Sequence, residues 1–477
     1  MKASPQVAGT GRGNSQMSIE IPVSEPGDTP PSATGAPWPK AAAGWYAMGV
    51  FAVTLMFLQL DSGTITLLQQ PIKHDLQLSD VSFSLLLGPA IAVFYALIGV
   101  PMSRLVDTRK RTVILSIAIA VWSLMTVLCG FAQAFWQLAL CRIGVGAGGA
   151  INGPGAYSLI ADYFPRERLN RAISILQVGF VGGTALALVL GGVVIGLLKN
   201  VQPMHWGGLL IRPWQLVFMA VGAPGLLVAL LMRFTVKEPP RRGAEMLART
   251  RAIPFGEVLK FLVSNWRVYG PMMLGLAIGG IEQAGTLQWR PAFFQRTYGW
   301  TPQLIGEVSG LVTLSFSLLG IALGAWLSDR LAKRHDDANL RTVVFGYLIA
   351  LPFQIAGPLM PSPWLALICG GFALMAGLMG AAPQNAALQS ITPGTMRGQV
   401  TAVYLFVFTV IGQGLGPPFI ALINDVVLKD ESMIRYAMAG SAAIMGPLAV
   451  LVIWLGVKPY GKAIASVKQL ERGAGAG

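Results

Sequence analysis

The sequence predicts an all-α, polytopic membrane protein of twelve transmembrane helices, arranged as two related six-helix halves. Its 477 residues are 54% hydrophobic and only 12% charged, whereas soluble domains carry about a quarter charged residues. Apolar segments of about 20 residues, the length that spans a bilayer as a helix, recur along the chain. Two loop motifs also repeat at a nearly constant separation, as expected for a duplicated bundle.

The N-terminal segment, Met1 to Lys40, differs from the rest of the chain. It is polar and rich in Pro, Gly and Ser, which favours a disordered tail over a signal peptide. After this tail we expect an N-terminal bundle (41–235), a basic cytoplasmic linker (236–263), a C-terminal bundle (264–457) and a C-terminal tail (458–477). The twelve expected spans are 46–70, 81–103, 112–132, 135–162, 170–198, 214–235, 268–289, 303–327, 342–361, 364–390, 399–424 and 436–457.

The basic residues are distributed unevenly between the two sides of these spans. One side, which includes both tails, holds 27 Lys and Arg, the other side holds 7, and Arg142 alone lies within a span. The positive-inside rule therefore predicts that both termini lie in the cytoplasm, with the protein in the cell (inner) membrane. The net charge of +14 then reflects topology and weak attraction to anionic lipids, not nucleic-acid binding. We expect a monomer.

Two motifs imitate nucleotide-binding loops. Gly144-x-Gly146-x-x-Gly149 has the spacing of a dinucleotide fingerprint, but it lies in the fourth span without a preceding strand, where small residues let helices approach closely. Gly456-VKPY-Gly461-Lys462 lacks the Ser/Thr of a phosphate loop. The cysteines and histidines have no metal-ligand spacing, and neither HExxH nor GxSxG occurs. The sequence thus predicts no ATP, no cofactor, no metal and no enzymatic activity.

Two cytoplasmic loops of the first half recur in the second. Ser103-Arg-Leu-Val-Asp107-Thr-Arg-Lys-Arg111 follows span two, and Ala325-Trp-Leu-Ser-Asp329-Arg-Leu-Ala-Lys-Arg334 follows span eight. Pro165 and Pro393, which follow spans four and ten, are separated by almost the same length of chain as Asp107 and Asp329. Internal duplication of this kind is typical of secondary transporters, which bind substrate between the halves.

At these loops the chain resembles the major facilitator superfamily, whose loop pattern is G-x-L-A-D-R-x-G-R-R; Arg142 and Gly146 also match its fourth-span R-x-x-x-G. The runs "GPGAYSLIADYFPRERLNRAISI" and "VGAPGLLVALLMRFTVKEPPRRG" are similar to the bacterial spinster-type branch. That branch carries arginine after its span-one aspartate, where this chain has Ser62, and glutamate at the position of Gly149. The resemblance implies alternating access, with a cytoplasmic gate formed by Asp107, Arg111, Asp329, Arg330 and Arg334.

Three charged residues within spans are the main candidates for ion coupling and substrate binding. Asp61 in span one is costly in lipid unless it is paired or faces a cavity, and it could bind and release protons; the alternative is a fixed ion pair. Arg142 cannot deprotonate, but its planar fork suits a carboxylate; the alternative is an arginine that snorkels to the outer interface. Glu282 is nearly the pseudo-symmetric mate of Asp61, so both carboxylates should face one central cavity. Its alternative is a water-facing position near the outer mouth.

Further polar residues within spans are weaker candidates for substrate contact, because helix-to-helix hydrogen bonds explain most such side chains. These candidates are Asn152, Tyr157, Gln283, Gln384, Asn385 and Gln413.

The sequence therefore predicts a secondary active transporter that takes up a small organic anion by proton-coupled alternating access. In this scheme protonation of Asp61 frees Arg142 to bind the carboxylate of the substrate. One alternative is efflux of an amphipathic, lipid-like molecule or drug, which predicts a cavity open to lipid. An alternative of another class is a non-transporting membrane sensor, which usually carries a longer cytoplasmic domain than these tails provide.

Overall fold

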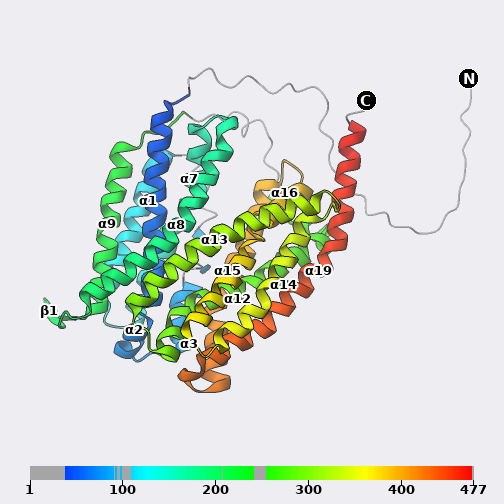
Figure 1. Ribbon diagram of the computed structural model, residues 1–477. Coiled ribbons are helices and arrows are strands. Elements are labelled where there is room, and N and C mark those ends of the chain that lie inside the picture. Colours follow the sequence, from blue (N-terminus) through cyan, green and yellow to red (C-terminus); the bar gives the residue numbers. More distant parts are fainter. Residues whose placement is uncertain are drawn as a thin grey trace, which may run out of the picture.

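The computed structural model describes residues 38–90, 92–93, 97–98, 109–206, 208–240 and 254–474. Nearly all regular structure in these residues is helical, and the helices form a bundle in which the first helix begins and the last helix ends on the same side (Figure 1). Residues 1–37 of the expected tail, Asp107, and residues 91, 94–96 and 99–103 of the expected second span lie outside the described residues. The first half contains α1 (Ala41–Leu67), α2 (Gln69–Leu76), α3 (Asp80–Leu87), α5 (Arg111–Cys129), α6 (Phe135–Gly149), α7 (Asn152–Tyr163), α8 (Arg166–Leu198) and α9 (Pro213–Thr235).

The second half repeats this order of helices with additional breaks. The eleventh expected span of the chain is interrupted by the π-helical turns η1 and η2, a feature that is common at functional positions in long helices. The elements are α11 (Phe255–Ser264), α12 (Trp266–Tyr298), α13 (Pro302–Ala332), α14 (Ala338–Leu359), α15 (Pro363–Leu378), α16 (Ala381–Ile391), α17 (Arg397–Val407), η1 (Phe408–Gln413), α18 (Gly414–Leu422), η2 (Ile423–Leu428), η3 (Glu431–Met433) and α19 (Ile434–Ala474).

The expected spans correspond to helices, although the number twelve stays a prediction. Nine helices in the described part of the chain are long and apolar enough to cross a membrane. Of the other three expected spans, 81–103 is described only in part. The span 135–162 is broken between α6 and α7 at Ala150 and Ile151, and 268–289 lies within the longer helix α12.

The structure differs from the sequence expectation at three places. The loop before α9 forms a hairpin of β1 (Met204–Trp206) and β2 (Leu209–Ile211), whose tight turn includes Gly208 with a φ of +83°. The linker 236–263 contains most of α11. Helix α19 continues to Ala474 rather than ending at the expected tail, because Tyr460 and Ile464 are buried in the core of the second half.

The two halves show the same helix packing. In the first, α1 packs against α8 and α5 against both α6 and α9; in the second, α12 packs against η1 and α18, and α14 against both α15 and α19. Between halves, α8 packs against α13 and α3 against α18. The α8–α13 contact requires glycine, because a Cβ at Gly192 would lie 2.8 Å from the Gln303 carbonyl oxygen.

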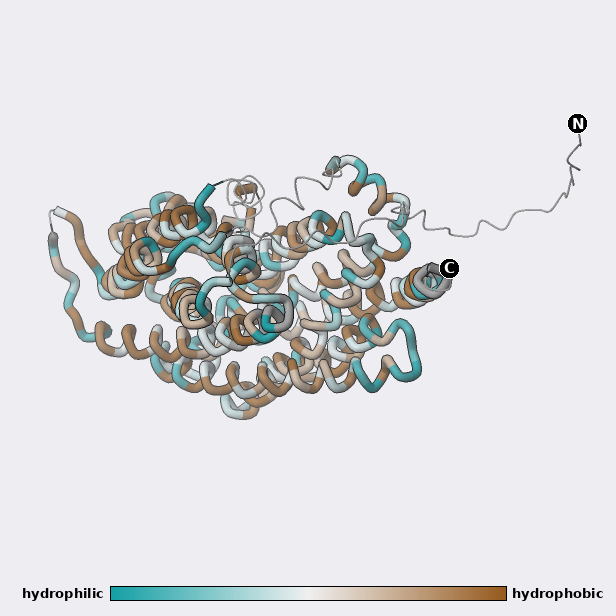
Figure 2. Tube along the Cα trace, turned by 90° about the horizontal axis from the view of Figure 1, so that it is seen from above, coloured by the Kyte–Doolittle hydropathy of each residue, from teal (hydrophilic) through white to brown (hydrophobic). Residues whose placement is uncertain are grey.

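The surface of the bundle is apolar, as expected where helices contact lipid. Large exposed side chains include Leu197 (75% exposed), Leu227 (68%) and Phe234 (77%). Viewed from above, hydrophobic residues predominate along the outer helices, and hydrophilic residues gather in connecting segments (Figure 2). We call the end of the bundle that carries α2, the hairpin and η3, away from the chain ends, the distal end (Figure 1).

Candidate functional site

The arginine of the fourth expected span and the aspartate of the first form a buried ion pair. Arg142 Nη1 lies 2.6 Å from Asp61 Oδ2, and the two residues are 0% and 1% exposed. Thr126 Oγ1 donates a hydrogen bond of 2.9 Å to Asp61 Oδ1. One guanidinium and one hydroxyl therefore compensate the carboxylate, as a buried charge requires.

Three helices bring these groups together: α1 carries Asp61, α5 carries Thr126 and α6 carries Arg142. Helices α5 and α6 can approach closely because Gly148 has no side chain, and a Cβ there would lie 2.9 Å from the Ala118 carbonyl oxygen. The glycine-rich run of the fourth span thus serves helix packing, in agreement with its place in an apolar segment.

Two buried donors on this span have no hydrogen-bond partner among the described residues: Arg142 Nε and Asn152 Nδ2. Leaving such a donor unpaired costs about 1–3 kcal/mol, so both are available to a ligand. Asn152 is 3% exposed. Tyr157 follows on α7, but its side chain lies outside the described part of the structure.

Glu282 is a second buried carboxylate, located on α12 and 2% exposed. Its Oε1 accepts a hydrogen bond of 2.8 Å from Thr286 Oγ1, and its Oε2 accepts one of 2.6 Å from Gln354 Nε2 on α14. Among the described residues no cation lies within salt-bridge distance of it; Arg290, further along α12, interacts with it electrostatically.

Each carboxylate has its hydrogen-bond partners within its own half. Asp61 bonds to side chains of α5 and α6, and Glu282 bonds to a side chain of α14. This agrees with the need of an almost fully buried carboxylate for donors on neighbouring helices. That both carboxylates face one central cavity stays a prediction.

Four further expected substrate contacts, Gln283, Gln384, Asn385 and Gln413, belong to helices of the second half. Gln283 and Gln384 are half-buried, whereas Asn385 and Gln413 are exposed. Asn385 Nδ2 donates to the Ala381 carbonyl oxygen of its own helix at 3.0 Å. In the described part of the chain, no hydrogen bond joins these four residues to Asp61 or Arg142.

Of the loop charges expected to form a cytoplasmic gate, Arg111, Asp329, Arg330 and Arg334 are described, and they lie at the end of the bundle opposite the distal end. Arg111 bonds within its own half, to Asp162 at 2.5 Å and to Glu238 at 2.8 Å. Asp329, Arg330 and Arg334 are exposed at the end of α13. The Arg330 guanidinium lies 5.7 Å from the Trp326 ring of the same helix. The contact of Arg111 ties α5, α7 and the segment after α9 together rather than joining the two halves.

Instead, hydrogen bonds and ion pairs join the halves at the distal end. Asp80 at the start of α3 is 0% exposed and accepts two hydrogen bonds of 2.6 Å from Arg296 of α12. Asn424 Nδ2 donates to it at 2.9 Å, and Lys73 contacts both Asp80 and Glu431. We call Lys73, Asp80, Arg296, Asn424 and Glu431 the distal lock.

Sequence analysis missed the distal lock, because its charges lie at loop ends where a charged residue is unremarkable. A second contact reinforces it: Asp425 Oδ2 accepts from the Val81 backbone N–H at 2.8 Å, so the second half caps a helix of the first. Burial raises the pKa of Asp80, but the hydrogen bonds and charges of Arg296 and Lys73 outweigh burial and lower this pKa below its ordinary value.

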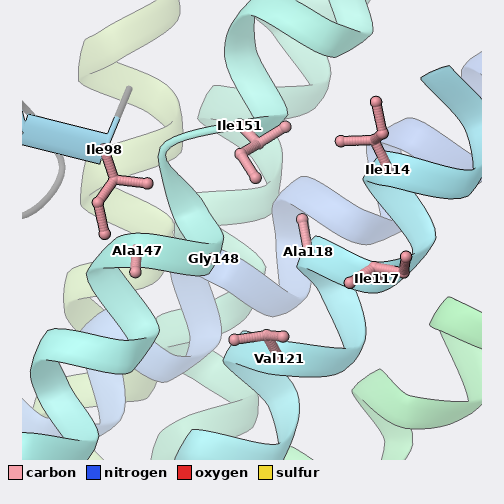
Figure 3. Close-up of a pocket in the computed structure, with 8 residues that line it drawn as sticks. All are labelled: Ile98, Ile114, Ile117, Ala118, Val121, Ala147, Gly148 and Ile151. Carbon is pink, nitrogen blue, oxygen red and sulfur yellow. The ribbon is translucent and has the colours of Figure 1, made fainter. Parts of the chain in front are cut away.

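A shallow crevice of about 250 Å³ opens on the first half and is lined only by apolar residues. Its residues come from α5, α6, the break between α6 and α7, and the described part of the second expected span (Figure 3). The lining residues are Ile98, Ile114, Ile117, Ala118, Val121, Ala147, Gly148 and Ile151.

In the described part of the chain, no three His, Cys, Asp or Glu side chains are grouped to hold a metal ion.

Known proteins share both the sequence and the fold. Residues 50–417 match the model of the Major Facilitator Superfamily. An "MFS-type efflux pump" of Mycolicibacterium smegmatis is 26% identical over 423 residues, which cover 87% of this chain and 93% of that protein. The protein spinster of Drosophila melanogaster is 22% identical over 397 residues, 81% of this chain and 62% of the relative.

A crystal structure of a bacterial homolog of the human lysosomal transporter Spinster, in an inward-facing and unoccupied conformation, has a TM-score of 0.74 to this chain. It is 26% identical, and the match covers 90% of this chain and 99% of that one. These similarities indicate a transporter rather than an enzyme. The chain, a multi-pass membrane protein, belongs to the Major Facilitator Superfamily and is a spinster-like transporter within it.

Proposed function

We propose that this transporter takes up a small organic anion, such as an aromatic or other carboxylic acid, together with protons. The cell membrane would hold it with both termini in the cytoplasm, so that the distal end faces outward. The observation that carries the proposal is the buried ion pair of Arg142 and Asp61, at 2.6 Å. A fixed positive charge next to a carboxylate that can be protonated would couple the binding and transport of an anion to those of a proton.

The pair supports a simple exchange of partners. While Asp61 is ionised, it occupies the Arg142 guanidinium. Protonation of Asp61 removes this internal anion, and the guanidinium can then bind a substrate carboxylate bidentately. The unpartnered Arg142 Nε and Asn152 Nδ2 would supply further donors. Each unit of pH difference contributes about 1.4 kcal/mol per proton to accumulation.

Two gates, the distal lock and the loop charges at the opposite end of the bundle, would give alternating access. With both termini in the cytoplasm, the distal lock, whose contacts join the halves in this structure, would close the outward side, and the central site would exchange with the cytoplasm. Closure of the other side would use the loop charges Asp107, Arg111, Asp329, Arg330 and Arg334. Tyr157, Gln283, Gln384, Asn385 and Gln413 remain proposed substrate contacts, and Glu282 a proposed proton-coupling residue.

The test is uptake by the full-length protein in liposomes, with a panel of labelled organic acids and an imposed pH gradient. We expect accumulation of at least one acid, which Asp61→Asn abolishes. Asp75→Asn serves as a matched control, because Asp75 bonds to Trp214 and Arg212 of its own half. If Asp61→Asn still concentrates the acid against its gradient, the coupling scheme is wrong.

A second candidate function is efflux of an amphipathic molecule. The apolar crevice beside Ile117, which is 58% exposed, supports it, as does the similarity to an efflux pump. Export of a lipid-like dye from everted vesicles would depend on the crevice and little on Arg142. Val121→Trp, which fills the crevice, would then reduce export, whereas Arg142→Gln would not.

A further inference from the structure

The second half contains a buried carboxylate without the arginine that its counterpart has. We propose that Glu282 is a second, independent proton-binding site and that Gln354 is the residue that positions it. This inference rests on the proposed proton coupling and deepens it, since a cycle that uses both carboxylates would carry two protons.

The internal repeat shows which positions correspond. Glu282 follows Asp61 at almost the same separation as that between the aspartates of the two repeated loops. The starts of α6 and α15, at Phe135 and Pro363, have the same separation as the repeated prolines after spans four and ten. At this separation Gln354 corresponds to Thr126. Each half therefore places a carboxylate on its first span and a hydrogen-bond donor to that carboxylate on its third.

The two halves differ in their fourth spans, the span that carries Arg142 in the first half. At the separation that relates α6 to α15, the position equivalent to Arg142 is Gly370, and a Cβ built there has no neighbour within 4 Å. The second half thus retains the carboxylate and its donor but has no guanidinium at the corresponding place. The charge of Asp61 is compensated by contact with a cation, and that of Glu282 is not.

This difference decides which carboxylate takes up a proton without a change of partners. An ionised carboxylate buried without a contacting cation is costly, and binding a proton removes the cost. For Asp61, the proton must first displace the attraction of Arg142 at 2.6 Å. Glu282 has only two neutral donors at contact distance among the described residues, so the proton competes with no ion pair there.

Among the described residues, two titratable groups interact electrostatically with Glu282: Arg290 on its own helix and Tyr347 on α14. Tyr347 in turn interacts with Tyr404 of α17. Helices η1 and α18, which pack against α12, carry no charged side chain, and α19 carries none between Ala437 and Val457.

Gln354 can hold both protonation states. With its amide nitrogen toward Glu282, as in this structure, it donates to the ionised carboxylate at 2.6 Å. Rotated by half a turn, its carbonyl oxygen accepts from the hydroxyl of the protonated acid, because a primary amide offers both a donor and an acceptor. Gln354 itself is half-buried and so less buried than Glu282, which is 2% exposed.

The test is a pH titration of the purified full-length protein in nanodiscs, followed by the infrared absorption of the protonated carboxyl C=O group. The only ligand is the proton, so no transported substrate is needed. Between about pH 9 and pH 5, above the usual pKa of exposed carboxyl groups, we expect one buried carboxyl band. Glu282→Gln removes it, whereas Asp61→Asn leaves it. The control Glu307→Gln also leaves it; Glu307 is a carboxylate of α13 that accepts a hydrogen bond from Gln303 of the same helix.

Gln354→Leu tests the positioning role. The variant loses a hydrogen bond to each protonation state, but the bond to the charged form is the stronger one. The midpoint of the band should therefore move toward higher pH by about one unit, a tenfold change in proton affinity. A band that persists in Glu282→Gln, or requires Na⁺, would overturn the proton site. An unchanged midpoint in a folded Gln354→Leu protein would overturn the role of Gln354. Neither result depends on whether Asp61→Asn abolishes uptake, so this inference and the proposed function can fail separately.

Discussion

Asp80→Asn should open the distal lock while preserving the shape of the side chain. In the closed arrangement Asp80 accepts from Arg296 and Asn424 and contacts Lys73. The asparagine side chain is uncharged, and one of its two acceptors becomes a donor. Lys73 and Arg296, whose side chains are only 5% and 7% exposed, then lose the carboxylate that lies between them.

The size of the effect follows from this burial. Removing one partner of a buried ion pair costs about 3–5 kcal/mol because a charge is left uncompensated. Glu431, with a side chain 56% exposed, still contacts both cations, so we expect about 2–3 kcal/mol instead of the full range. Since 1.4 kcal/mol is tenfold in an equilibrium constant, the population of the open state should rise about 30- to 140-fold.

Spin labels can measure this shift. We would place cysteines at Gln202 in the first half and Met433 in the second, both exposed at the distal end, after replacing the three native cysteines with serine. Pulsed electron resonance should then show a longer distance in Asp80→Asn. The distance in Asp75→Asn should equal that in the parent protein, because Asp75 bonds within one half. Identical distance distributions for Asp80→Asn and the parent would refute the reasoning.

Other predictions concern pH, packing and the central pair. The pKa of Asp80 is lowered in the closed state, so the lock should keep its full strength from pH 8 to about pH 5. It should weaken only below about pH 4, because there the open form binds a proton. Distances between the same spin labels, measured across this pH range, test this prediction. Gly306→Leu should stop transport in folded protein, since even a Cβ there meets the backbone of α8. Glu238→Gln should lower the unfolding temperature measured by scanning fluorimetry, through loss of about 1–3 kcal/mol from its contacts with Arg111 and the Thr112 N–H. Arg142→Lys should reduce uptake of the acid more than tenfold although the charge is kept, because an ammonium cannot bind a carboxylate bidentately.

The central ion pair could be anticipated from the sequence, and the distal lock could not. Arg142 and Asp61 stand out because they lie in long apolar spans, where a charge must be compensated. Asp80 and Arg296 lie at the ends of spans, where water can compensate a charge, and they are far apart in the sequence. Only the relative position of the two halves reveals that they meet.

The order of the helices could also be predicted from the sequence, because the length of each apolar segment and the charge of the adjoining loops define the spans. The hairpin before α9 and the continuation of α19 were not, since each depends on contacts made after folding, such as burial of Tyr460. For Glu282, the repeat indicated a counterpart of Asp61 but not its orientation. That orientation depends on Gln354 of α14, a neutral residue that gives no signal in an apolar span.

The position of the lock relative to the two carboxylates suggests how a proton could act on it. Asp80 stays ionised at any pH the protein meets near neutrality, so protons cannot open the lock directly. Helix α12, however, is continuous from Glu282 in its middle to Arg296 in the lock, and Gln295 on it donates to the Leu67 carbonyl oxygen at the end of the helix that carries Asp61. A proton can shift the gate only if the two states bind it with different affinity. Rotation or tilt of α12 would provide this difference, because it moves Glu282 relative to Gln354 and Arg296 relative to Asp80 at the same time.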